Sequence, residues 1–117
     1  MVARVQEYAP VDFAIPSIAA HELYLCAFRS ARSTENLARI GRLRIPIVGF
    51  DREDAVEAGR IRAALASAGN PIGPYDVLIA GQAKARDLIL ITRNTREFGR
   101  VNGLSVQNWE DDDTTIA

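Results

Sequence analysis

Short apolar segments alternate with longer amphipathic ones along this 117-residue chain, and this alternation most constrains its fold. The apolar runs at 11–15, 45–50, 88–91 and 104–107 have the length of strands, and helical patterns lie between them. Because strands separated by helices pair in parallel, the pattern predicts an α/β domain with a mainly parallel sheet. The run 88–91 has no polar residue, which is typical of a strand covered on both faces.

The predicted helices, in chain order, cover residues 2–9, 17–32, a segment beginning at 33, 51–69 and 74–87. Ser17 and Asp51 are the predicted N-caps, and Pro74 fits the first turn of its helix. The helix from Ser17 and the one that follows it are expected to form a hairpin.

The composition is that of a soluble globular domain, with 48% hydrophobic and 25% charged residues. We predict one domain over residues 1–109 and an acidic tail over 110–117. The net charge of -1 gives no overall basic signal for nucleic acid. Cys26 is the only cysteine, so no internal disulfide can form. It is expected to be buried. No apolar run approaches the roughly 20 residues that span a bilayer, so we expect a cytoplasmic protein and no membrane contact.

Two carboxylates lie in strongly apolar surroundings. Glu22 falls in the middle of an apolar helical segment, and Asp76 opens another. A buried carboxylate needs a partner, a proton or a metal, and no basic residue lies near either acid in the sequence. Asp76 could instead merely complement the dipole at a helix start. A shared divalent cation is the functional alternative.

A third carboxylate, Glu97, follows the predicted strand 88–91. Ligands of parallel sheets bind beyond the carboxyl ends of the strands, so Glu22, Asp76 and Glu97 are predicted to converge there. Oxygen donors without a His or Cys cluster suit Mg²⁺ or Mn²⁺. Such a cation can activate water for attack on a phosphodiester. Taken alone, however, Glu97 could be a solvated loop residue.

The loop around Glu97 supplies further polar side chains. Thr92 and Asn94 could bind the hydration shell of a metal or a phosphate oxygen, and Arg93 and Arg96 could hold the backbone of an RNA substrate.

Three segments together resemble the VapC-type PIN-domain ribonuclease toxins. They are Gly73 to Ala83, Leu90 to Phe98 and Val101 to Trp109, and the spacing from Ser17 to Glu22 fits the same family. The resemblance covers about residues 10 to 109, and the stretch 73–98 is its specific part.

This resemblance implies an α/β PIN-like fold and an endoribonuclease that uses Mg²⁺ or Mn²⁺ on structured RNA such as tRNA or rRNA. It also implies a homodimer and a VapB-like antitoxin that blocks the site. Glu22, Asp76 and Glu97 then correspond to acids of the family, and Thr92 and Asn94 to its Thr-x-Asn motif.

The family's first strand ends in Leu-Asp-Thr-Asn and carries the leading metal ligand, which has no match here. We therefore expect the first central strand to be missing from this chain. Either the chain start is assigned too late, by roughly 20–30 residues on the usual lengths of a strand and a helix, or this is a truncated toxin. In the second case the alternative function is a catalytically silent fragment that only dimerises or binds an antitoxin.

Overall fold

The computed structural model describes residues 13–109, which cluster in two compact units. We call residues 13–50 the N-terminal unit and residues 51–109 the C-terminal unit. The predicted helix over 2–9 and the acidic tail over 110–117 lie outside the described residues. The prediction of a single domain over residues 1–109 stays a prediction.

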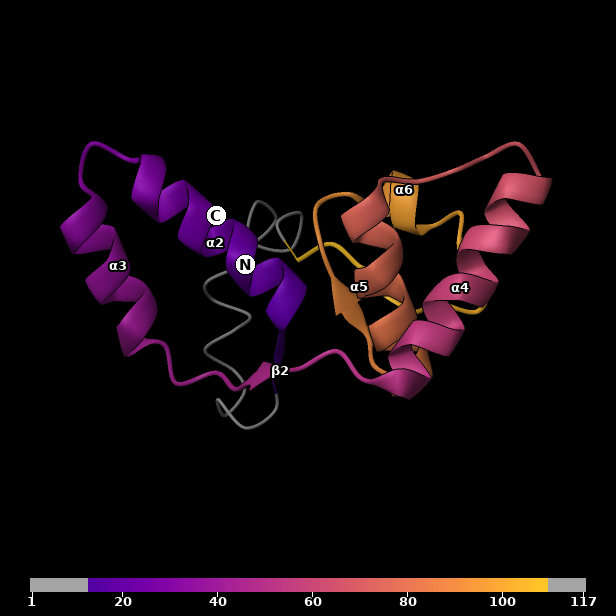
Figure 1. Cartoon of the computed structure of the whole chain (residues 1–117), viewed down its shortest axis with the longest axis horizontal. Helices are drawn as coiled ribbons and strands as arrows, with labels where there is room; N and C mark the ends of the chain where they lie inside the picture. Colours follow the sequence, from indigo (N-terminus) through magenta and orange to yellow (C-terminus); the bar gives the residue numbers. More distant parts are fainter. Residues whose placement is uncertain (1–12, 110–117) are drawn as a thin grey trace. The chain divides into compact units, whose positions relative to one another are not determined.

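The N-terminal unit is a helical hairpin with one pair of short strands (Figure 1). Its elements are β1 (Ile15–Pro16), α2 (Ser17–Arg29), α3 (Ser33–Arg42) and β2 (Ile47–Val48). β1 and β2 pair in parallel, with Ile15 opposite Ile47. The predicted hairpin is confirmed, but Ser17 is the first helical residue, and Pro16 occupies the cap position without a side-chain hydrogen bond.

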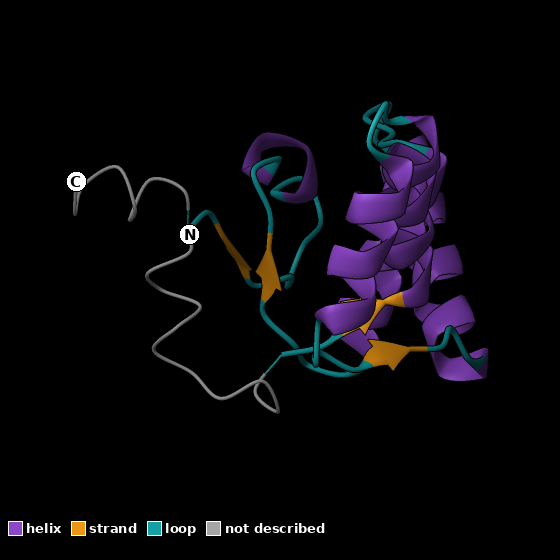
Figure 2. Cartoon of the chain, turned by 90° about the vertical axis from the view of Figure 1, so that its left-hand side faces the viewer, coloured by secondary structure: helices purple, strands orange, loops and turns teal. Residues whose placement is uncertain are grey.

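The C-terminal unit packs two longer helices together and adds a second pair of strands (Figure 1). Its elements are α4 (Arg52–Ser67), α5 (Pro74–Ala85), β3 (Leu90–Ile91), α6 (Thr95–Phe98) and β4 (Val106–Gln107). Leu90 pairs with Val106 in a parallel register. Predicted parallel pairing is thus confirmed, although the described strands form two separate two-stranded sheets, drawn as orange arrows in Figure 2.

The core of the C-terminal unit lies between α4 and α5, which make the most extensive contact of any two described elements. α4 buries Ala58 and Ile61, and α5 buries Val77 and Ala80. The helices approach so closely that a Cβ atom at Gly81 would lie 2.6 Å from the Cβ of Ala58. Small side chains at this crossing therefore set the distance between the two helices.

Asp51 begins α4 with a capping box, as its position in the sequence predicted. Its side chain accepts a hydrogen bond from the backbone N–H of Asp54 at 3.1 Å, and Asp54 Oδ2 accepts one from the N–H of Asp51 at 3.0 Å. Each side chain thus satisfies a backbone donor that the first helical turn leaves without a partner.

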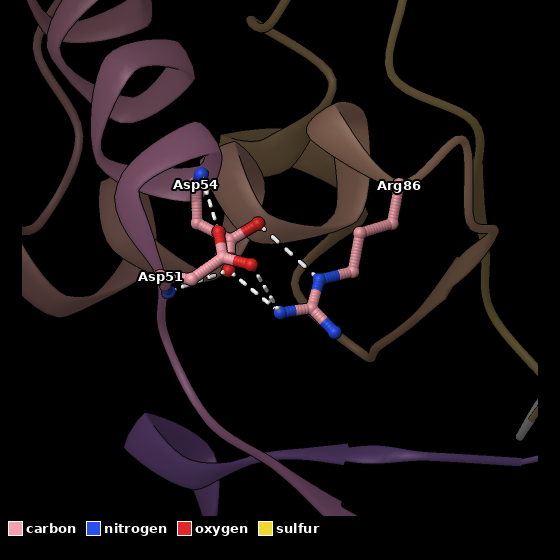
Figure 3. Close-up of polar contacts among 3 residues, drawn as sticks. All are labelled: Asp51, Asp54 and Arg86. Carbon is pink, nitrogen blue, oxygen red and sulfur yellow. Dashed lines mark hydrogen bonds and ion pairs between the residues drawn. The ribbon is translucent and has the colours of Figure 1, made fainter.

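Asp54 is completely buried, and Arg86 reaches it from just after the end of α5 (Figure 3). Arg86 donates from Nε to Asp54 Oδ1 at 3.3 Å and from Nη2 to Oδ2 at 2.9 Å, and Nη2 lies 3.5 Å from Asp51 Oδ2. This two-point ion pair joins the start of α4 to the end of α5.

The Asp54–Arg86 pair should make the stability of the protein depend on pH in the acidic range. The hydrogen bond from Arg86 is the main cause that holds the pKa of Asp54 below its ordinary value of 3.8, against the opposing effect of burial. A carboxylate with a depressed folded pKa contributes stability that is fully present above its unfolded pKa and is lost as pH falls through the folded one. We expect urea unfolding at a series of pH values to show a loss below about pH 4. The Asp54→Asn variant should show a smaller loss over that range, and an equal loss would contradict this role.

Some burial predictions are wrong. Leu88 and Ile89 are 45% and 56% exposed, so the run 88–91 is not covered on both faces within the described residues. Cys26 is exposed as well, on α2. No helix within residues 13–109 has the length and apolar character needed to cross a membrane.

Candidate metal centre

Asp76 and Glu97, which are 21 positions apart in the sequence, come together in the C-terminal unit. Asp76 lies in the first turn of α5, and Glu97 lies in the short helix α6. Both carboxylates lie against Gly73, the residue that precedes α5: a Cβ atom at this glycine would be 3.4 Å from Asp76 Oδ2 and 3.5 Å from Glu97 Oε1. The structure therefore brings two of the three predicted acids close to the same point.

Each carboxylate oxygen of Glu97 accepts a short hydrogen bond. The backbone N–H of Gly73 donates to Oε1 at 2.6 Å, and Asn94 Nδ2 donates to Oε2 at 2.6 Å. These two bonds, that of Gly73 first, are the largest causes that lower the pKa of Glu97, and partial burial opposes them. A hydrogen bond with Asp76 and the charge of Arg100 lower this pKa further. Glu97 is thus held ionised and in one orientation.

Asn94 is fixed by its own neighbours. Its Oδ1 caps α6 by accepting from the N–H of Glu97 at 3.4 Å, and its N–H donates to Thr92 Oγ1 at 3.1 Å. The N–H of Thr92 in turn donates to the carbonyl of Gln107, just past the end of β3. Thr92 and Asn94 therefore connect the position of Glu97 to the β3–β4 pair.

The geometry around Gly73 suits a hard divalent cation. Two carboxylates in contact repel unless a proton or a cation lies between them, and Mg²⁺ is held in proteins by one or two carboxylates together with water. In residues 51–109, no third His, Cys, Asp or Glu side chain joins the pair at metal-binding distance. The C-terminal unit thus offers two carboxylates as candidate ligands.

The other predicted site residues are Glu22, Arg93 and Arg96. Glu22 is exposed on α2, in the N-terminal unit, so the expectation of a buried carboxylate there is wrong. Its helix is apolar in sequence, yet Leu23 and Leu25 beside it are themselves exposed. Arg93 and Arg96 are exposed on either side of Asn94.

Sequence reasoning missed Gly73 as a member of the site. Glycine has no side chain whose chemistry could indicate a role at a metal site. Its position immediately before Pro74 and three residues before Asp76 was the available signal. A glycine there places a bare backbone N–H beside the first helical turn.

The chain is similar to known proteins of one family. The family model for the PIN domain matches residues 2–104. The tRNA(fMet)-specific endonuclease VapC of Shigella flexneri is 44% identical over 97 residues, which make up 81% of this chain and 74% of the relative.

Two solved structures are similar as well. A DNA-bound VapBC structure from Salmonella typhimurium has a TM-score of 0.78 at 41% identity, over 82% of this chain and 74% of that one. VapBC-1 from nontypeable Haemophilus influenzae has a TM-score of 0.83 at 29% identity, over 93% of this chain and 84% of that one. The chain described here belongs to the PIN-domain family and, within it, to the VapC ribonucleases.

Proposed function

We propose that this protein is a Mg²⁺- or Mn²⁺-dependent endoribonuclease and that Asp76 and Glu97 hold the cation. The observation that carries the proposal is that both carboxylates approach the same point beside Gly73, in a chain of the VapC ribonuclease family. Glu22 is proposed as a third ligand on the resemblance alone. When bound, such a cation supplies an activated water and neutralises negative charge that develops on the phosphate.

The residues around the cluster have separate proposed roles. The hydrogen bonds from Gly73 and Asn94 keep Glu97 ionised and oriented before substrate arrives, so no reorganisation is needed at the moment of reaction. Arg93 and Arg96 bind phosphates of the RNA backbone, because one guanidinium group can donate two parallel hydrogen bonds to a phosphate. Thr92 acts through Asn94.

The proposed substrate is a structured RNA of the tRNA class. The relative from Shigella flexneri is named as a tRNA(fMet)-specific endonuclease, and its 44% identity makes tRNA the first substrate to test. Arg93 and Arg96 alone would bind any phosphate backbone, so they supply affinity and not the choice of RNA.

The proposed partners are a VapB-like antitoxin and a second copy of the chain. Similar solved structures are VapBC complexes, which supports the first partner, and the homodimer rests on the family resemblance. A cytoplasmic location is proposed because the substrate and the antitoxin would be found there.

Metal-dependent cleavage of tRNA tests the proposal. We expect the purified chain to cut tRNA with Mn²⁺ and to lose this activity with EDTA. The Glu97→Gln variant should cleave roughly 100-fold more slowly, since supporting groups alone cost 10–100-fold at metal sites. Glu53→Gln is the matched control, because Glu53 is an exposed acid of α4. Equal cleavage by wild type and Glu97→Gln would contradict the assignment of Glu97.

One observation favours a second candidate function, binding without cleavage. In residues 51–109 no third metal-binding side chain joins Asp76 and Glu97, and metal affinity falls when a site has few charged ligands. A chain that forms a stable complex with an antitoxin yet leaves tRNA intact at millimolar Mn²⁺ would support this alternative.

A further inference from the structure

The backbone conformation at position 73 does not require a glycine. Its φ of -57° and ψ of 151° are open to every L-amino acid, and they are the usual values for a residue that precedes proline. The residue also occupies the cap position of α5, where Ser, Thr, Asp or Asn could satisfy a helix donor and Gly makes no side-chain bond. The reason for glycine must therefore lie in what a side chain would meet.

A side chain at this position would meet the two acids. The three heavy atoms nearest to a Cβ atom built on Gly73 are Asp76 Oδ2 at 3.4 Å, Glu97 Oε1 at 3.5 Å and Asp76 Cγ at 3.8 Å. These are ordinary contact distances, so an alanine would fit without moving either acid. It would, however, fill the space beside both carboxylate oxygens.

We infer that Gly73 is a positioning residue that keeps this space open for the hydration shell of the cation. The inference rests on the proposed function, because it assumes that Asp76 and Glu97 hold the metal. A point about 3.4 Å from both oxygens is too far for Mg²⁺ itself, which binds oxygen at about 2.1 Å. It is suited to a water molecule on the cation, because Mg²⁺ keeps several of its waters when bound to protein.

The hydrogen bond to Glu97 separates this role from a purely structural one. An alanine at position 73 keeps the backbone N–H that donates to Glu97 Oε1, so the carboxylate stays oriented. Only the water space is lost. A methyl group there should weaken the binding of the cation without removing either ligand. The expected result is a partial loss of affinity for the cation.

Mn²⁺ binding by the full chain, measured by electron paramagnetic resonance and calorimetry without RNA, tests the inference. We expect Gly73→Ala to raise the Kd for Mn²⁺ about tenfold, at the lower end of the cost of altering supporting groups at metal sites. Its melting temperature without metal should be unchanged or slightly higher, since a glycine was replaced in a permitted conformation. Gly59→Ala is the matched control, because nothing lies within 4 Å of a Cβ atom there; its Kd should equal that of wild type.

The outcomes distinguish this inference from the proposed function. If Gly73→Ala binds Mn²⁺ as tightly as wild type while Asp76→Asn does not bind it, the inference is wrong and the metal site stands. A lower metal-free melting temperature for Gly73→Ala would also overturn it, because the glycine would then serve packing. A wild-type chain that binds no Mn²⁺ removes the proposed site and this inference together.

Discussion

Replacing Arg86 with methionine is expected to destabilise the folded protein strongly. The substitution keeps much of the side-chain volume but leaves the Asp54 carboxylate, which is fully buried, without its two-point partner. Breaking a fully buried ion pair costs about 3–5 kcal/mol, and the cost is smaller here because the Arg86 side chain is 30% exposed and water can reach the pair. We expect the free energy of unfolding, measured by urea denaturation at pH 7, to fall by roughly the lower of these values, because the capping-box bond to Asp51 remains.

Two comparisons isolate the charge of Asp54. In the Arg86→Met background, Asp54→Asn should restore part of the lost stability, because a neutral amide is less costly to bury than a carboxylate. Arg60→Met is the control, since the Arg60–Glu57 contact of 3.4 Å is largely exposed on the arginine side and exposed pairs contribute little. If Arg86→Met unfolds at the same urea concentration as wild type, the pair does not hold α4 to α5.

Replacing Asp76 with asparagine is expected to abolish RNA cleavage. Asparagine has the same shape but no charge, so the site would keep one carboxylate, and a single acid is a poor ligand set for Mg²⁺. We expect a fall in the cleavage rate of about 1,000-fold or more, on the scale of 1.36 kcal/mol in barrier height for each factor of ten. The rate should be measured on tRNA at several Mn²⁺ concentrations.

The same variant separates catalysis from helix stability. Asp76 also lies in the first turn of α5, where a negative charge favours the helix dipole, so Asp76→Asn should lower stability slightly. Glu53→Gln makes a comparable change in the first turn of α4, away from the cluster, and should leave cleavage unchanged. Full activity of Asp76→Asn would show that Asp76 serves only the helix.

Local signals predicted the helices well because their causes lie close together in the sequence. Asp51 caps α4 through a residue three positions later, and Pro74 begins α5 by its own geometry. The ion pair of Asp54 was not predictable in this way, because its partner lies 32 residues away.

Part of the candidate site was predictable from topology and resemblance. Asp76 and Glu97 were expected to meet, and they do. Glu22 was expected to be buried because its neighbours are apolar, but an apolar sequence predicts burial only where another element covers the helix, and Leu23 and Leu25 are exposed. The proposed role of Gly73 could not be predicted for a different reason, because glycine has no side chain whose chemistry would indicate it.

Asn94 uses both ends of its amide on one residue, with Oδ1 on the backbone of Glu97 and Nδ2 on its carboxylate. The helix that it caps has only four residues, too few to persist without such support. The same side chain therefore stabilises the helical turn α6 and orients the Glu97 carboxylate. Heat or a bound peptide that unwinds the turn would therefore also release the Glu97 carboxylate from its fixed orientation.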